Sequence, residues 1–237
     1  MSTTISMRRV EAETLDHLPE DDPHAIRSRR DLRRINRIMG NLPILDALLS
    51  ASLLRAPSHI AELGAGDGSL LLRLAKRRSR HWPGVALTLV DRQNLVSAQT
   101  RAAFADVGWT ARATEMDVFV WLDREDHPRY DAIMANLFVH HFEGDELFRL
   151  FLGIARITDC FIACEPRRAR IALLGSHLVG AIGANEVTRR DAVLSVRAGF
   201  RDRELSAYWP EHHGWQLSET DARLFSHTFS AVRRGKT

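Results

Sequence analysis

Apolar and polar positions along the chain follow two patterns, which predict strands and helices in alternation. Strand-length apolar runs occur at residues 58–63, 85–90, 109–114, 131–135 and 158–164. In most of the intervals between them, apolar residues recur three and four positions apart, as at Leu147, Leu150, Phe151 and Ile154. This spacing is typical of a helix that buries one face. Repeated strand, helix and strand segments predict a doubly wound α/β fold with a mainly parallel sheet.

The two ends of the chain depart from this alternation. Two helices are predicted before the first strand, at 24–39 and at a leucine-rich stretch that ends before Pro57. Residues 1–23 are polar and contain an acidic, proline-flanked cluster, which favours a mobile arm or loop. The runs 214–219 and 224–232 have no helix between them and predict an antiparallel hairpin that turns at Thr220-Asp221.

Length and composition indicate one globular domain with an N-terminal extension. The chain has 237 residues, of which 45% are hydrophobic and 27% charged. No apolar run is long enough to span a bilayer and no secretory signal is visible, so we expect a cytoplasmic protein. Cys160 and Cys164 lie in one strand-like run and are expected to be buried thiols without a disulfide. The net charge of +3 allows nucleic-acid binding without indicating it.

The most informative motif lies at residues 60–68, Ile-Ala-Glu-Leu-Gly-Ala-Gly-Asp-Gly, directly before a helical run. Glycine is needed where the backbone turns sharply and a bulky cofactor approaches closely. The dinucleotide fingerprint requires a glycine at position 69, where this chain has Ser69. A phosphate-binding loop requires Gly-Lys-Ser/Thr before a helix, and that pattern is missing as well. Nicotinamide, flavin and nucleoside triphosphate chemistry are therefore disfavoured.

This glycine motif resembles motif I of the class I S-adenosylmethionine-dependent methyltransferases. Three further elements match that superfamily in order: Asp91 ends the second strand-like run, Asp117-Val118 follow the third, and Asn136-Leu137 follow the fourth. The resemblance implies a Rossmann-like seven-stranded methyltransferase sheet with a C-terminal antiparallel hairpin and two N-terminal capping helices. It also divides the chain into a cap at 1–56 and a methyltransferase domain at 57–237.

The same resemblance implies S-adenosyl-L-methionine as the cofactor. In this family the glycine loop admits the methionine portion, the acid after the second strand binds the ribose, and the acid after the third contacts the adenine. The cofactor-binding residues expected from it are Glu62, Gly64, Ala65, Gly66, Gly68, Asp91, Arg92, Asp117, Val118, Asn136 and Leu137.

A narrower resemblance concerns the methyl acceptor. The segments 31–40, 136–142 and 183–192 are similar to bacterial methyltransferases associated with type III polyketide synthases. That similarity implies O-methylation of a small phenolic or polyketide-type acceptor in secondary metabolism. Two alternatives stay open: an RNA or protein methyltransferase, and a non-catalytic cofactor-binding partner subunit. The first would use the arginine stripe Arg27, Arg30, Arg34 and Arg37.

Candidate catalytic residues follow the fourth strand-like run. Histidine has a pKa near ~6.5 and can accept a proton from a phenol with a pKa near ~10, so His140 or His141 is the predicted general base. Arg167 and His177 are predicted to contact substrate, the latter from an apolar, glycine-spaced segment at 175–183. No metal site is expected, because His212-His213 have no further ligand at a suitable spacing.

Overall fold

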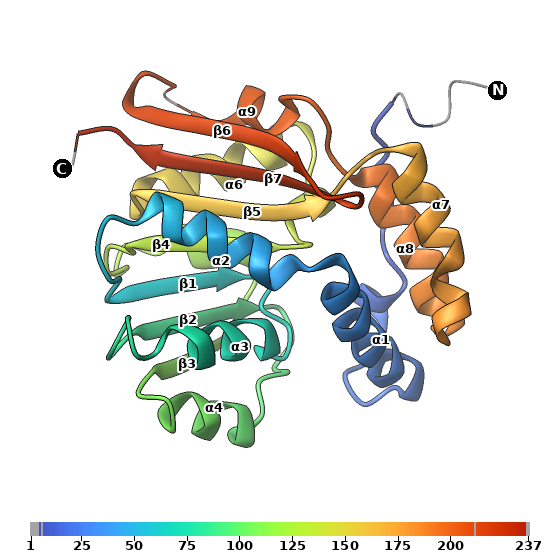
Figure 1. The fold of residues 1–237 in the computed structure, drawn as a ribbon, viewed down its shortest axis with the longest axis horizontal. Helices are drawn as coiled ribbons and strands as arrows, with labels where there is room; N and C mark the ends of the chain where they lie inside the picture. Colours follow the sequence, from blue (N-terminus) through green and yellow to red (C-terminus); the bar gives the residue numbers. More distant parts are fainter. Residues whose placement is uncertain (1–4, 6, 211, 236–237) are drawn as a thin grey trace.

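The protein is described by a computed structural model that covers residue 5 and residues 7–210 and 212–235. A single seven-stranded sheet runs through it in the order β3-β2-β1-β4-β5-β7-β6 (Figure 1). The strands are β1 His59–Leu63, β2 Ala86–Asp91, β3 Thr110–Glu115, β4 Ala132–Asn136, β5 Cys160–Pro166, β6 Trp215–Ala222 and β7 Ser226–Arg233. β1 to β5 pair in parallel and β7 is antiparallel to both β5 and β6. The predicted sheet and its closing hairpin are confirmed.

The turn of that hairpin lies further along the chain than the sequence predicted. β6 continues to Ala222 and the chain turns at residues 223–225 instead of Thr220-Asp221. Thr220 pairs with Thr228 through their hydroxyl oxygens, 3.2 Å apart, and Asp221 pairs with His227 at 2.9 Å. These cross-strand pairs extend the ladder past the polar residues that suggested a turn.

Helices cover both faces of the sheet, and each layer closes its own hydrophobic core. On one face lie α2 Asn41–Ser52, α3 Ser69–Arg78 and α4 Ala98–Ala105. On the other face lie α5 Val118–Leu122, α6 Gly144–Ile157 and α9 Glu204–Tyr208. Successive strand residues point to opposite faces, so Ile60 of β1 joins the first core and Ala61 the second. α2 is thus part of the core of the sheet, and the division at residues 56 and 57 stays a prediction.

A third group of helices stands beyond the carboxyl ends of the parallel strands (Figure 1). It contains α1 Pro23–Met39, α7 Arg170–Leu178 and α8 Glu186–Ala198. α1 begins where the Asp22 carboxylate accepts hydrogen bonds from the backbone N–H groups of His24 and Ala25. It ends at Gly40, whose φ of 75° lets α2 start at once in a new direction. The two predicted N-terminal helices are confirmed.

Residues 7–22, ahead of α1, lie against the rest of the molecule, which corrects the prediction of mobility for this part of the arm or loop; residues 1–4 and 6 of that prediction lie outside the described residues. The backbone N–H groups of Thr14 and Leu15 each donate a hydrogen bond of 2.9 Å to the Asp191 carboxylate of α8. Arg8 donates to the backbone oxygens of Ala198 and His140. A short 3-10 turn, η1 Leu15–His17, follows. The polar composition of this segment suggested mobility. The acceptors that hold it lie more than 100 residues away in sequence, so no local pattern reveals them.

The cysteines and the helix lengths agree with the expectations from sequence. Cys160 and Cys164 are buried and free, and burial raises the pKa of each thiol to about 12. Among the described residues, none of the helices has the length and apolarity needed to cross a membrane.

Candidate functional site

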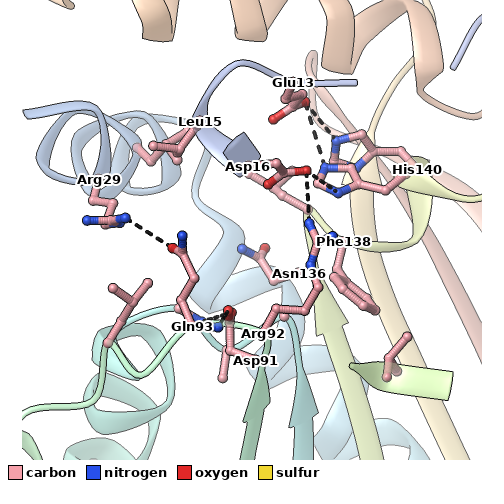
Figure 2. A pocket seen from close by; sticks show the side chains of 18 of the residues that line it. Glu13, Leu15, Asp16, Arg29, Asp91, Arg92, Gln93, Asn136, Phe138 and His140 are labelled. Carbon is pink, nitrogen blue, oxygen red and sulfur yellow. Dashed lines mark hydrogen bonds and ion pairs between the residues drawn. The ribbon is translucent and has the colours of Figure 1, made fainter. Parts of the chain in front are cut away.

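A cavity of about 510 Å³ opens at the carboxyl ends of β1, β2 and β4 (Figure 2). Its floor consists of the loops that leave these strands, and its roof is the segment 10–17 ahead of α1. One face of α1 closes a side with Arg29, Leu32, Arg33 and Asn36. The floor and the roof supply the two sets of polar groups that characterise the site.

Most of the sequence-predicted site residues line this cavity. They are Glu62, Gly64, Ala65, Gly66, Asp91, Arg92, Asp117, Val118, Asn136, Leu137, His140 and His141. Three others lie outside its lining. Gly68 begins α3 with a φ of 72°, Arg167 forms an ion pair of 2.7 Å with Asp221, and His177 lines a separate hollow between α7 and α8. The roles predicted for these three stay predictions.

The glycine loop has the geometry for which glycine is required. Gly64 and Gly66 have φ values of 66° and 54°, which other residues rarely adopt. A Cβ on Gly64 would lie 2.3 Å from the Phe138 ring, whereas one on Gly66 would meet nothing within 4 Å. The Asp91 carboxylate accepts a hydrogen bond of 2.8 Å from the Gly66 N–H. The end of β2 therefore holds the loop open toward the cavity.

Glu62 contributes a buried carboxyl group with one oxygen that has no hydrogen-bond partner among the described residues. It is buried in the cavity wall, and its Oε2 accepts no hydrogen bond in the part of the chain that the structure describes. Burial, and then the charges of Asp67 and Asp91, raise the pKa of Glu62 well above its ordinary value. A buried, unpaired carboxyl group is costly. This one is suited to accept hydrogen bonds from an ammonium group of a bound ligand, as the amino-acid end of S-adenosylmethionine offers.

The loops after β3 and β4 complete the floor. Asp117 caps α5 by accepting a hydrogen bond of 2.8 Å from the Phe119 N–H, so it acts as a helix cap while it lines the cavity. Asn136 accepts a 2.8 Å hydrogen bond from the Asn41 amide, which links β4 to the start of α2. Leu137 has a φ of 52°, which is strained for a leucine. Strain of this kind is common at ligand sites, and here it turns the chain toward η2 Val139–His141.

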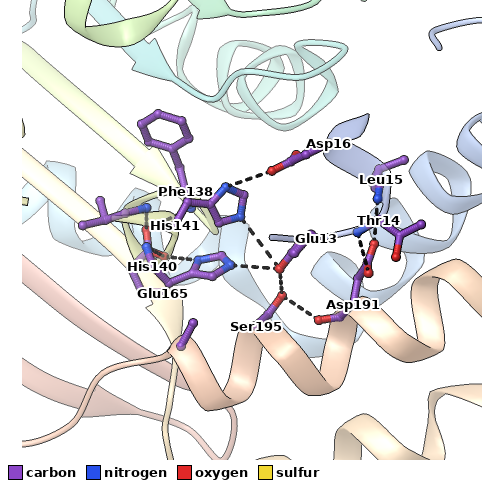
Figure 3. A network of polar contacts seen from close by, with 12 residues as sticks. Glu13, Thr14, Leu15, Asp16, Phe138, His140, His141, Glu165, Asp191 and Ser195 are labelled. Atoms are coloured by element: carbon purple, nitrogen blue, oxygen red, sulfur yellow. Dashed lines mark hydrogen bonds and ion pairs between the residues drawn. The ribbon is translucent and has the colours of Figure 1, made fainter. Parts of the chain in front are cut away.

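His140 is buried and held between two carboxylates (Figure 3). Its Nδ1 lies 2.8 Å from Glu165 Oε2, and its Nε2 lies 3.4 Å from Glu13 Oε1. Burial lowers the pKa of His140, but hydrogen bonds to Glu13 and Glu165 and their negative charges raise it more, to about 9. Glu165 also accepts hydrogen bonds from the backbone N–H groups of Phe138, Val139 and His140. His140 is therefore a charged residue that positions the loop after β4.

His141 differs from its neighbour although the two rings meet edge to face, 4.4 Å apart. It lines the cavity with a quarter of its side chain exposed, and Glu13 and Asp16 lie 3.8 Å and 3.5 Å from its ring nitrogens. Burial and the positive charge of His140 lower the pKa of His141 below 6.5, although Glu13, Asp16 and Glu165 act in the opposite direction. The lowered pKa favours the uncharged form of the His141 imidazole, which lies at the cavity surface.

The roof residues Glu13 and Asp16 were missed by the sequence analysis. Burial raises the pKa of Glu13, but its hydrogen bond to His140 and the charges of His140 and His141 lower it more. Ser195 of α8 donates a further hydrogen bond to Glu13, and Asp16 lies 3.5 Å from Arg92 of the floor. No local motif marks these acids, because their partners lie on η2, α8 and the loop after β2. Their only sequence signal is that they lie in an acidic segment ahead of a predicted helix.

Among the described residues, one cluster has the composition of a metal site. Glu13, His140 and His141 each offer a ligand atom, and these atoms lie within 4.8 Å of one another. The His140 Nε2 faces Glu13 at hydrogen-bond distance, and Ser195 donates to the same carboxylate. Hydrogen bonds within the protein account for the positions of Glu13 and His140, and the His141 ring nitrogens lie 3.8 Å from Glu13 and 3.5 Å from Asp16. The expectation that the site needs no metal stays a prediction.

Comparison with known proteins places the fold. No family model matches the chain. Over 98 residues it is 32% identical to uncharacterised methyltransferases of Mycobacterium tuberculosis and Mycobacterium bovis. The match covers 41% of this chain and 45% of each relative, so the chain is matched to about half the length of these curated relatives.

Solved structures are similar over almost the whole chain. The plantazolicin methyltransferase BpumL, crystallised with a desmethylplantazolicin analogue and S-adenosylhomocysteine, has a TM-score of 0.62 at 12% identity and covers 90% of this chain and 92% of its own. An O-methyltransferase family protein from Burkholderia thailandensis has a TM-score of 0.58 at 14% identity, with coverages of 92% and 62%. The magnesium protoporphyrin IX methyltransferase of Synechocystis, with S-adenosylhomocysteine bound, has a TM-score of 0.51 at 14% identity, with coverages of 92% and 91%. The chain has the fold of the class I S-adenosylmethionine-dependent methyltransferases.

Proposed function

We propose that this protein is an S-adenosylmethionine-dependent methyltransferase that methylates a hydroxyl group of a small phenolic or polyketide-type acceptor. The observation that carries the proposal is the position of His141. The His141 imidazole, whose pKa is lowered by burial and by the charge of His140, lies on the cavity surface beside the glycine loop of the floor. The methyltransferases named among the similar proteins support the reaction class.

The floor residues fit the cofactor. Glu62 would accept hydrogen bonds from its ammonium group, the loop at Gly64 and Gly66 would lie against its methionine portion, and Asp91 would accept hydrogen bonds from the ribose hydroxyls. Asp117 and Val118 would border the adenine. When bound, S-adenosylmethionine supplies an electrophilic methyl group carried on a sulfonium. The unpaired Glu62 oxygen and the open space at Gly66 support this assignment.

His141 is the proposed general base. The acceptor hydroxyl loses its proton as its oxygen is methylated, and a neutral imidazole with a pKa below that of a phenol can take this proton. His140 cannot, because Glu13 and Glu165 keep it charged at neutral pH. The charged groups that face His141 are His140, Glu13, Asp16 and Glu165. Glu13 and Asp16 would stabilise the imidazolium once it has formed.

The acceptor portion of the cavity is lined by apolar groups. Leu15 and Val10 of the roof and Phe138 and Phe142 after β4 contribute them. Phe138 and Phe142 meet edge to face with ring centroids 5.2 Å apart. Apolar walls with a few convergent polar groups are typical of small-molecule sites. This lining favours an aromatic or otherwise apolar acceptor.

Cofactor binding is tested by calorimetry with S-adenosylmethionine, S-adenosylhomocysteine and NAD. We expect the adenosyl compounds to bind, and Asp91→Ala to weaken them by about 1–3 kcal/mol because polar partners are left unpaired. Asp126→Ala, at an exposed pair with Arg124, is the matched control and should bind normally. Unchanged affinity in Asp91→Ala, or tighter binding of NAD, would contradict the cofactor assignment.

The base is tested with His141→Gln and His141→Ala, assayed across pH. Loss of a general base typically lowers turnover by about 10²–10⁴-fold, and cofactor affinity should persist. The wild-type rate should rise with pH along a limb below pH 6.5, because burial and His140 lower the pKa of His141. His59→Gln, at the exposed start of β1, is the control. A loss smaller than about tenfold would remove His141 from this role.

The acceptor is tested by a methyl-transfer screen of phenols, polyketides, peptides and tRNA. Methylation of a phenol or polyketide on oxygen is the expected result. Transfer to tRNA or to a peptide would replace the small-molecule assignment. Cofactor binding without turnover on any acceptor would indicate a non-catalytic subunit.

A further inference from the structure

An apolar stripe crosses the surface of α7 and of the short turn that follows it, η3 Val179–Ile182. Its side chains are Ile171, Leu174, Leu178 and Ile182, each between 40% and 58% exposed. Spacings of three and four residues place the first three on one helix face. Residues 166–185 contain no aspartate or glutamate. A row of exposed aliphatic side chains of this length marks an interaction surface more often than chance exposure.

A basic helix lies beside this stripe. α1 carries six arginines and a single acid, Asp31, which is buried. Arg27 donates to the backbone oxygen of Gly183 and Arg34 to that of Ile182, each at 3.3 Å, so α1 touches the end of the stripe. With the one arginine of 170–182, the two segments hold a net charge of +6 in a chain whose total is +3. The positive charge of the chain is therefore concentrated on α1, where Arg29 and Arg33 face the cavity and Arg30 and Arg37 are exposed.

We propose that α1, α7 and η3 form a surface that binds an anionic lipid membrane. We define the membrane-binding surface as Arg30, Arg37 and Ile38 of α1 together with Ile171, Leu174, Leu178 and Ile182. Arg30, Arg37 and Ile38 are exposed. Surface-bound helices insert aliphatic side chains at the headgroup boundary while neighbouring basic residues meet anionic headgroups. The membrane-binding surface offers both groups side by side.

Other occupants fit less well. A second copy of the chain, paired symmetrically, would set this concentration of arginines against itself, which is unfavourable. A nucleic acid would neutralise the arginines but would leave the four aliphatic side chains uncovered, and the stripe contains no aromatic residue on which a base could stack. An anionic bilayer covers the aliphatic side chains and neutralises the arginines at once.

The membrane-binding surface and the cavity share α1. Arg29, Leu32, Arg33 and Asn36 line the cavity, while Arg30 and Arg37 belong to the exposed face. Binding to a bilayer would hold the cavity near a phase in which apolar acceptors concentrate. The inference goes beyond the proposed function, because lipid binding needs neither cofactor nor turnover.

The test is co-sedimentation of the full chain with vesicles of phosphatidylcholine alone and of phosphatidylcholine containing phosphatidylglycerol. We expect binding to the anionic vesicles only, and weaker binding as salt rises from about 50 mM to about 500 mM. Arg30→Gln and Arg37→Gln should each lower vesicle affinity about fivefold. Leu174→Glu with Leu178→Glu should lower it by about tenfold or more, because apolar burial is lost.

The matched control is Phe148→Glu with Leu152→Glu, which places the same substitutions at exposed apolar positions of α6. This control should bind vesicles like the wild type. If the glutamate double variant has a lower melting temperature than the wild type, Leu174→Ser with Leu178→Ser replaces it in the vesicle assay. S-adenosylmethionine affinity, measured on each variant, separates this outcome from failure of the proposed function.

Three results would overturn the proposal. The first is a wild-type chain that does not bind anionic vesicles at low salt. The second is equal loss of binding in the α6 control. The third is a dimer that the Leu174 and Leu178 substitutions dissociate in sedimentation velocity, since the stripe would then be covered by a second copy.

Discussion

The floor and the roof of the cavity are built in different ways. The floor consists of loops at the carboxyl ends of adjacent parallel strands, and backbone conformation shapes it, as the positive φ values of Gly64 and Gly66 show. The roof is one segment held by charged and polar side chains from η2 and α8. The shape of the floor therefore depends on backbone geometry, whereas the position of the roof depends on charged and polar side chains from other elements.

The largest loss of stability is expected from substitution of Glu165, the residue of β5 that contacts His140. Glu165→Gln removes the buried charge that faces His140 and should cost about 3–5 kcal/mol in the free energy of unfolding, the usual cost of breaking a buried pair. Glu219→Gln is the matched control, because Glu219 is equally buried beside His227 and lies outside the cavity lining. Denaturant unfolding should show similar losses in both variants, but only Glu165→Gln should change the pH profile of turnover. An unchanged pH profile of turnover in Glu165→Gln would show that the pairing of His140 with Glu165 does not affect the reaction.

The pH dependence of the free energy of unfolding tests the pairing of His140 with its two carboxylates. Its folded pKa of about 9 lies above the ordinary value of 6.5, so its contribution is fully present below pH 6.5 and is lost as pH rises through 9. A shift of this size corresponds to about 3 kcal/mol. The pKa of His227 is raised as well, so the wild type is compared with His140→Asn by urea unfolding at pH 6 and pH 9. Equal slopes in the two proteins would contradict the pairing of His140 with Glu13 and Glu165.

Substitutions at two glycines test the backbone geometry of the floor. Gly64→Ala and Gly84→Ala both place a Cβ at a similar positive φ, but only the first brings it against the Phe138 ring. Gly64→Ala should therefore be less stable than Gly84→Ala by about 1–3 kcal/mol, the usual cost of overpacking. It should also lose cofactor affinity in calorimetry. Similar stability and cofactor affinity in the two variants would show that the loop accommodates a Cβ at position 64.

Substitution of Asp16, in the roof, should have a smaller effect, which concerns the pH dependence of the rate. Asp16→Asn removes one of the negative charges that raise the pKa of His141, so this pKa should fall further below 6.5. The acid limb of the rate profile should move to lower pH while cofactor affinity stays constant. The measurement is kcat against pH, with Asp126→Asn as the control. A shift toward higher pH would assign the limb to another group.

No effect is expected from chelation. Glu13 and His140 are held by hydrogen bonds, and His141 lies beside the carboxylates of Glu13 and Asp16. EDTA should therefore leave turnover unchanged, and added Mn²⁺ or Zn²⁺ should not raise it. Activity that disappears with EDTA and returns with one of these ions would make the cluster a metal centre.

The strands, the mainly parallel sheet with its closing hairpin and most of the residues that line the floor were predicted from the sequence, whereas the order of the strands came from the structure. Strand-length apolar runs place residues on a buried layer, and the glycines, Asp91, Asp117 and Asn136 follow strand ends, which parallel pairing brings to one edge. The position of the hairpin turn was not predicted correctly, because Thr220 and Asp221 are residue types common in turns. Their pairing with Thr228 and His227 across the hairpin is visible only in the structure.

The roof and the different surroundings of the two histidines could not be predicted from the sequence. His140 and His141 are adjacent and identical in type, so no local pattern distinguishes them. Contacts with Glu13, Asp16 and Glu165, each distant in sequence or on another element, raise one pKa and leave the other lowered by burial. Electrostatic interactions depend on distance in space and on burial, and both are properties of the folded chain.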